Sequence, residues 1–197
     1  MKAGAPPTLA GERRDLDPMT QSGVRRYNCE AGMVQVKIGP GDYYVTAAAN
    51  EILVTILGSC VAVCMRDPVL GVGGMNHFLL AESVSGEWGG TGAATRYGNH
   101  AMETLINDIV ALGGVRAPLR GQGIRGRSVI DSSLPIGQKN VEFAERYLSN
   151  EGIPIAAKHV GGFRPRRIHY FPHTGKVQML QLRRDNDEAL LRRPSRN

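Results

Sequence analysis

The sequence has few cysteines, no long apolar run and no repeated segment. Three cysteines in 197 residues are too few for a disulfide framework, so the thiols are expected to stay free in a reducing cytoplasm. The apolar run 52–65 is interrupted by Gly58, Ser59 and Cys60 and is followed by Arg66. It is therefore shorter than the roughly 18 residues of a membrane span. The N-terminus lacks the apolar core of a signal peptide. We expect a cytoplasmic protein without membrane insertion.

Aromatic residues are also scarce, and acidic residues are outnumbered by basic ones, which leaves a net charge of +6. Nucleic-acid binding would use aromatic residues as a stacking platform. None of them interleaves the arginines near the C-terminus, so we expect no nucleic-acid partner. Such a basic segment either stays solvated or steers the protein toward an acidic partner. The arginines concerned are Arg183, Arg184, Arg192, Arg193 and Arg196.

Composition divides the chain into three parts. Residues 1–27 are rich in glycine, proline and charge and show no periodicity, which predicts a flexible N-terminal arm. Residues 28–182 predict a single domain, long enough to bury a core of its own. Residues 183–197 predict a basic C-terminal tail.

Hydrophobic periodicity predicts the elements of the central domain. Helical spacing indicates helices over 99–114 and 136–152, each with glycine at its end. The glycine-rich segment 83–98 has no period and predicts a loop, a candidate flap over a site. Short alternating or apolar segments predict strands over 33–39, 43–47, 51–57, 60–67, 71–80, 127–134, 153–162, 166–175 and 176–182. This order predicts a mixed α+β domain rather than a doubly wound parallel sheet.

A predicted β-hairpin brings one cysteine and one histidine together. If Pro68 and Val69 form the centre of the turn, Cys60 lies directly opposite His77. Directly opposed residues have Cβ atoms about 4.5–5.5 Å apart, so the thiol and the imidazole could share a hydrogen bond. A histidinium there would lower the thiol pKa. The turn at Gly58 and Ser59 would supply backbone N–H groups for an oxyanion.

Three alternatives remain for this stretch. The segment after Ser59 could instead be a short helix, which would also favour a thiolate at Cys60. Cys60 could simply be core filler, as Cys64 is expected to be, because cysteine is often buried. A zinc site is disfavoured, because Cys60 and Cys64 would lie about 13 Å apart on a strand and Pro172 opposes a helix through the later histidines. We therefore expect no metal and no cofactor.

Several blocks of the sequence resemble the CheD family of chemoreceptor glutamine deamidases. They are "IGPGDYYVT", "VTILGSCVAVCMRDP", "GGMNHFLL", "RYGNHAMETLIND", "IGQKNVEFAERYLSNEGIPIAAKHVGG" and "FPHTGKV". Together they cover about residues 33–182. The resemblance implies a layered α/β sandwich with a mixed, largely antiparallel sheet. It also implies a likeness to the deamidase domain of cytotoxic necrotizing factor toxins.

The resemblance further implies an activity and its residues. Family members convert glutamines of bacterial chemoreceptors to glutamate, and some hydrolyse receptor glutamyl methyl esters. Cys60 and His77 match the family's catalytic pair, and Thr55 or, failing that, Ser59 would supply the hydroxyl that orients the histidine. The implied partners are the cytoplasmic helices of chemoreceptors and a CheC-type phosphatase. The other class of function left open is a non-catalytic adaptor that binds receptors or such a phosphatase.

One segment departs from the family pattern. After the first helix, relatives tend to carry a Phe-Gly-Gly-Ala-like sequence, whereas this chain has "GQGIRGRSVID". Within 122–128, Arg125 and Arg127 replace small or apolar residues. If the segment borders the active site, we expect it to affect substrate preference or activity.

Overall fold

The protein is described by a computed structural model over residues 25–28, 32–80, 93–125, 136–160 and 165–182. The predicted tail 183–197 and most of the predicted arm lie outside these residues. Strand β1 already begins at Arg25, so the last residues of the range 1–27 belong to a sheet.

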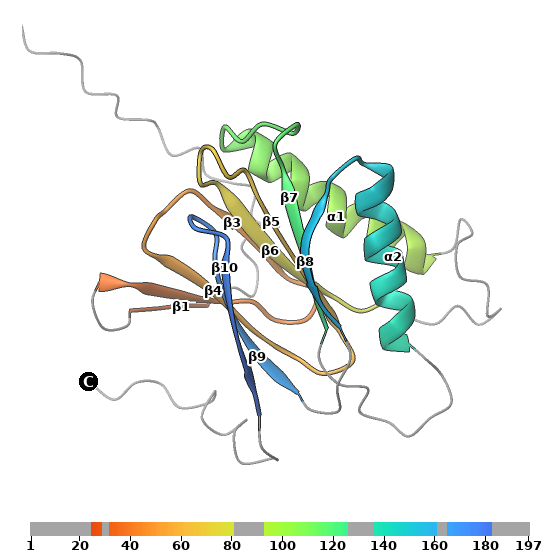
Figure 1. Ribbon diagram of the computed structural model, residues 1–197. Helices are drawn as coiled ribbons and strands as arrows, with labels where there is room; N and C mark the ends of the chain where they lie inside the picture. Colours follow the sequence, from red (N-terminus) through yellow and green to blue (C-terminus); the bar gives the residue numbers. More distant parts are fainter. Residues whose placement is uncertain (1–24, 29–31, 81–92, 126–135, 161–164, 183–197) are drawn as a thin grey trace, which may run out of the picture.

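Two five-stranded sheets and two helices form three layers (Figure 1). The sheet that we call the outer sheet has the order β1-β2-β4-β9-β10, and the central sheet has the order β3-β6-β5-β7-β8. Only the pairs β2–β4 and β7–β8 are parallel among the described strand pairs. The expected α+β class with mixed, largely antiparallel sheets is therefore confirmed. The expected likeness to the toxin deamidase domain stays a prediction.

The elements have the following bounds. The outer sheet contains β1 Arg25–Asn28, β2 Val34–Lys37, β4 Glu51–Leu57, β9 Arg166–Phe171 and β10 Lys176–Gln181. The central sheet contains β3 Tyr43–Thr46, β5 Val61–Arg66, β6 Gly73–Phe78, β7 Arg120–Arg125 and β8 Ile155–His159. The helices are α1 Ala93–Ala111 and α2 Ile136–Asn150. Among the described residues, no helix is long and apolar enough to cross a membrane.

Strand β5 shows why the most apolar stretch of the sequence lies in the middle layer. Side chains alternate between the two faces of a strand. Val61 and Val63 pack into the core shared with the helices, whereas Ala62 and Cys64 pack into the core between the sheets. Both faces are buried, so the sequence needs apolar residues at consecutive positions.

The first helix begins earlier than the periodicity indicates. Residues 93–98, which were expected to belong to a loop, form the first turns of α1. Gly98 explains the difference, because a Cβ atom there would lie 2.6 Å from Phe143 and 2.7 Å from Leu80. The close contact therefore requires glycine at a position where helical spacing gives no apolar signal. The rest of the expected loop, 83–92, lies outside the described residues.

Strand β7 was not predicted. Its sequence, RGQGIR, contains two glycines and no alternating apolar residues, and glycine is depleted in strands. It forms because both of its neighbours supply ladder hydrogen bonds, β5 on one side and β8 on the other. The strand expected over 127–134 lies outside the described residues.

Candidate active site

The hairpin of β5 and β6 has a different register from the predicted one. His77 lies opposite Ala62, not opposite Cys60. The loop is longer than a two-residue turn, because Asp67 N–H donates to Val72 O at 2.8 Å. The register therefore shifts by two residues, which preserves the face on which each side chain lies.

The side chain of Asp67 stabilises this longer loop. Its Oδ1 accepts hydrogen bonds from the N–H groups of Val69 at 2.8 Å and Leu70 at 3.2 Å, and its Oδ2 accepts one from Val115 at 2.8 Å. These backbone donors lower the pKa of the Asp67 carboxyl group, the Val115 bond first. Gly71 completes the loop with a φ of 70°, a conformation that favours glycine.

Cys60 lies immediately before β5, at one end of the space between the sheets. It packs partly against the inter-sheet core and keeps intermediate exposure. Cys60 lies two residues before Ala62, the ladder partner of His77, which makes it a diagonal neighbour of His77 on the same face, a relationship with a separation of about 7–8 Å. No hydrogen bond joins the two side chains in the described part of the chain. The alternative of a short helix after Ser59 is wrong, because β5 starts at Val61.

Thr55 holds the ring of His77 across the two sheets. Thr55 lies on β4 and is 2% exposed, and its Oγ1 is 2.8 Å from His77 Nδ1. The same hydroxyl donates to the carbonyl oxygen of Ile38 at 2.8 Å. A hydroxyl has one hydrogen to donate, so it accepts from Nδ1–H. This assigns the tautomer in which Nε2 carries a lone pair.

The Nε2 atom of His77 is buried and has no hydrogen-bond partner. His77 is 2% exposed, and burial lowers its pKa to about 4, partly opposed by the Ile38 backbone. At neutral pH His77 is thus an uncharged imidazole with a free basic nitrogen. An unpartnered polar atom in such a place calls for an explanation in function or strain.

The thiol of Cys60 is also uncharged at rest. Burial raises its pKa above the ordinary value, opposed by its own backbone N–H. The expected histidinium that would lower the thiol pKa is absent, because His77 itself is neutral. At neutral pH neither side chain is charged, so the two residues do not form a preformed thiolate–imidazolium pair.

A turn at residues 39–42 fixes His77 from the other side, and sequence reasoning did not find this role. Gly41 N–H donates to His77 O at 2.7 Å, and His77 N–H donates to Asp42 O at 3.0 Å. Gly41 has a φ of 88°, and Asp42 Oδ2 accepts from Gly39 N–H at 3.1 Å. The segment IGPGD contains the glycines, but nothing in it indicates which histidine it would contact.

The remaining candidates occupy these positions. Gly58 and Ser59 form the bend between β4 and β5 and are partly exposed. Cys64 is fully buried, and burial raises its thiol pKa, as expected of a core residue. Within the described ranges, no three His, Cys, Asp or Glu side chains are grouped so that they could hold a metal ion.

The segment that departs from the family pattern borders Cys60. Arg125 is the backbone partner of Val61, the residue after the cysteine. Gln122 lies further along β7, opposite Cys64, and donates to Gly175 O at 2.9 Å. Arg127 and Ser128 lie outside the described residues. The backbone of Arg125 therefore lies next to the candidate site, which is the condition under which we expect this segment to affect substrate preference or activity.

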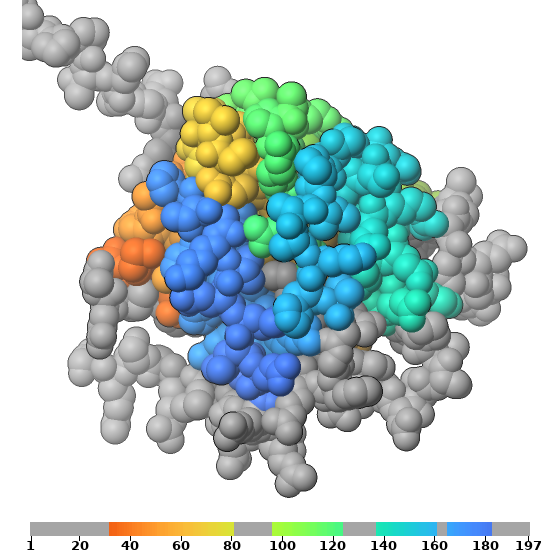
Figure 2. Space-filling model, viewed as in Figure 1, coloured from red at the N-terminus to blue at the C-terminus, as the bar shows by residue number. Residues whose placement is uncertain are grey.

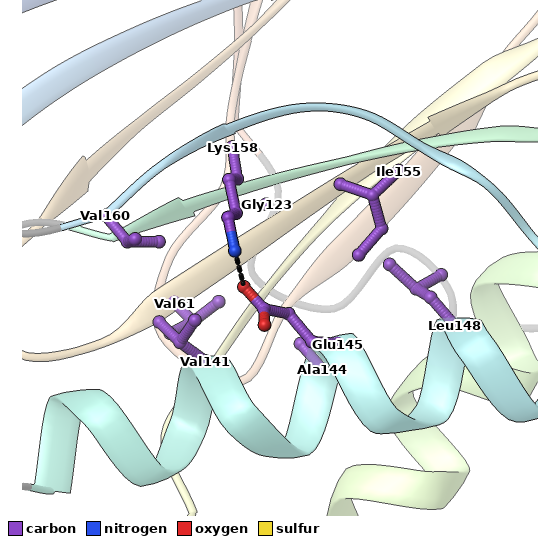
Figure 3. A pocket seen from close by; sticks show the side chains of 9 residues that line it. All are labelled: Val61, Gly123, Val141, Ala144, Glu145, Leu148, Ile155, Lys158 and Val160. Atoms are coloured by element: carbon purple, nitrogen blue, oxygen red, sulfur yellow. Dashed lines mark hydrogen bonds and ion pairs between the residues drawn. The ribbon is translucent and has the colours of Figure 1, made fainter.

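Two hollows flank β7 and β8, and neither is lined by Cys60, His77 or Thr55. A cleft of about 260 Å³ opens between β8 and β10, with β7 at its base (Figure 2). A small apolar pocket lies between α2 and the same strands, where Lys158 reaches Glu145 at 3.1 Å (Figure 3). Val61 and Gly123 line this pocket from the central sheet.

Comparison with known proteins identifies the family. Residues 79–181 match the family model described as CheD chemotactic sensory transduction. A protein of Rhodopseudomonas palustris (strain BisA53) is 50% identical over 86% of this chain and 80% of its own length. A protein of Halorhodospira halophila is 44% identical over 86% of this chain and 80% of its own length. One of Caulobacter vibrioides is 43% identical over 82% of this chain and 86% of its own length. Each relative is named "Probable chemoreceptor glutamine deamidase CheD". This chain belongs to the CheD family.

Among solved structures, the crystal structure of Bacillus licheniformis hypothetical protein YfiH aligns with 62% of this chain and 51% of its own. The identity is 17% and the TM-score is 0.41.

Proposed function

We propose that this protein hydrolyses the side-chain amide of glutamines in the cytoplasmic helices of chemoreceptors, giving glutamate and ammonia. Family membership and the names of the relatives support this substrate. The observation that carries the chemistry is the 2.8 Å contact between Thr55 and His77, with the free Nε2 of the histidine. Cys60 on the same face is the nucleophile.

The first half of the reaction forms a thioester. His77 Nε2 takes the thiol proton as Cys60 Sγ attacks the amide carbon. The carbonyl oxygen becomes an oxyanion, and we assign its stabilisation to the backbone N–H groups of Ser59 and Cys60 at the bend before β5. The C–N bond then breaks, and the histidinium gives its proton to the leaving amine, which departs as ammonia.

The second half hydrolyses the thioester. Neutral His77 takes a proton from water as the water oxygen attacks the thioester carbon, and the proton passes to Cys60 as the C–S bond breaks. The glutamic acid side chain and free enzyme remain, and the acid gives its proton to the released ammonia to become glutamate, so atoms and protons balance without a cofactor or a metal. A glutamyl methyl ester presents the same carbonyl group with methanol as the leaving group, so the site would also act as a receptor methylesterase.

Charge supports an acidic substrate. The chain carries a net charge of +6, and a basic field raises the rate of encounter with an acidic helix. Because the modified receptor segments are cytoplasmic, the reaction is placed in the cytoplasm. A CheC-type phosphatase stays a predicted partner.

Release of ammonia tests the proposal. Wild-type protein and Cys60→Ala are incubated with a purified receptor cytoplasmic fragment, and ammonia is measured over time. Wild type is expected to release ammonia and Cys60→Ala is not. Binding of the fragment without ammonia release by the wild type would favour the adaptor function instead.

A further inference from the structure

A tyrosine that neither the motif nor the family name assigns lies next to the turn that holds His77. Tyr97 lies near the start of α1 and is 41% exposed. Its hydroxyl makes no hydrogen bond with the described residues. The next residue, Gly98, is pressed against Phe143 and Leu80, which fixes the helix beneath Tyr97.

The Tyr97 hydroxyl lies over the turn that holds His77. A Cβ atom built on Gly41 would lie 3.4 Å from Tyr97 Oη, and Gly41 N–H donates to His77 O at 2.7 Å. One glycine therefore connects the tyrosine to the backbone of the histidine. The phenol oxygen therefore lies within van der Waals reach of the Gly41 position.

The charges around the phenol keep it a hydrogen-bond donor. Burial raises the pKa of Tyr97, the charge of Asp42 raises it further, and Cys60 adds to this only once its thiol ionises at high pH. At neutral pH the O–H group is intact and can donate to a carbonyl oxygen.

We propose that Tyr97 is a substrate-binding residue of the Cys60 site, whose hydroxyl donates a hydrogen bond to the glutamine side chain or to the adjoining receptor backbone. This inference rests on the proposed function. It assigns α1, which carries none of Cys60, His77 and Thr55, to substrate positioning. The hydroxyl contributes to binding, and proton transfer stays with His77.

Tyr97→Phe removes the hydroxyl and keeps the ring. The receptor fragment is expected to show a KM raised about 3- to 10-fold, the size expected for one lost hydrogen bond, with kcat within about twofold of wild type. Tyr147→Phe is the matched control. Tyr147 is a partly buried tyrosine on α2 that packs on Phe143, and its change is expected to leave both constants unaltered.

A second measurement separates binding from an effect on the thiol. The reaction of Cys60 with methyl methanethiosulfonate, which is small and carries no amide, is expected to be the same in Tyr97→Phe as in wild type. Unchanged KM in Tyr97→Phe, or a loss confined to kcat, would overturn the inference while leaving the deamidase proposal intact. Absence of ammonia release by wild type would instead overturn the proposed function.

Discussion

Thr55 and His77 lie on different sheets, and their side chains meet at 2.8 Å between Oγ1 and Nδ1. The contact is the one side-chain bridge in the described residues that orients His77. The Thr55 hydroxyl donates to the Ile38 carbonyl and accepts from the ring, so these two hydrogen bonds connect the Ile38 backbone to His77. The packing of the two sheets therefore determines which nitrogen of the histidine is basic.

Replacing Thr55 by valine should impair catalysis more than folding. Valine keeps the shape but cannot accept from Nδ1–H, so the ring is free to adopt the other tautomer. We expect kcat/KM for ammonia release to fall about 10- to 100-fold. Thr55→Ser keeps the hydroxyl and should retain most of the activity. Equal activity of the valine variant and wild type would show that the contact has no catalytic role.

The buried neutral His77 should make stability depend on pH. Its pKa is about 4 in the folded protein, against about 6.5 unfolded, so acid protonates the unfolded chain first. Neutral His77 therefore makes its full contribution to the free energy of unfolding above about pH 6.5. About 3 kcal/mol of this free energy is lost as the pH falls toward 4. Urea unfolding of wild type and His77→Gln between pH 7 and 4 should show their stability difference changing by that amount.

The other four histidines are common to both proteins in this comparison, so their titration cancels. A stability difference that stays constant from pH 7 to 4 would contradict the low pKa of His77. Direct titration of the ring by NMR provides the same test if the variant folds poorly.

The cysteines should differ in reactivity. In a Cys29→Ser background, iodoacetamide should label Cys60 well before Cys64, because Cys60 is partly exposed and Cys64 is 0% exposed. The rate at Cys60 should rise steadily with pH to above 9, because burial raises the pKa of its thiol. Peptide mapping by mass spectrometry gives both rates. Labelling of Cys60 as fast at pH 6 as at pH 9 would show a preformed thiolate.

The turn under His77 can be tested with a pair of glycines. Gly41→Ala and Gly152→Ala both place alanine at a positive φ, 88° and 66°, which costs about 1–2 kcal/mol. Of these two glycines, only Gly41 donates a hydrogen bond to His77 and lies close to the Tyr97 hydroxyl. We expect similar losses of stability by thermal unfolding, but a clear loss of kcat/KM only in Gly41→Ala. Equal activity in the two variants would remove the turn from the site.

Sequence patterns predicted the strands that form the site because β4, β5 and β6 are buried on both faces and carry strong apolar signals. They also predicted that Cys60 and His77 share a face. The predicted register was wrong, because hydrogen bonds made by the Asp67 side chain stabilise a longer loop. Such hydrogen bonds leave no trace in the pattern of apolar and polar residues. Thr55 was found only through the family resemblance, since its contact with His77 crosses two sheets.

Other features depend on contacts distant in sequence. Strand β7 is held by its neighbours rather than by its own glycine-rich composition. Gly41 and Tyr97 reach the site from the β2–β3 turn and from α1, and neither has a sequence signal that points to a cysteine. The neutral state of His77 follows from burial, which depends on the packing of both sheets.

The most direct test of the account follows individual glutamines of a receptor. A receptor cytoplasmic fragment is incubated with wild type, Cys60→Ala or His77→Ala, digested and analysed by peptide mass spectrometry. The account predicts that wild type converts particular glutamines to glutamates. It also predicts that Cys60→Ala converts none and that His77→Ala is slower by about 100-fold or more. Conversion by Cys60→Ala at the wild-type rate would contradict it.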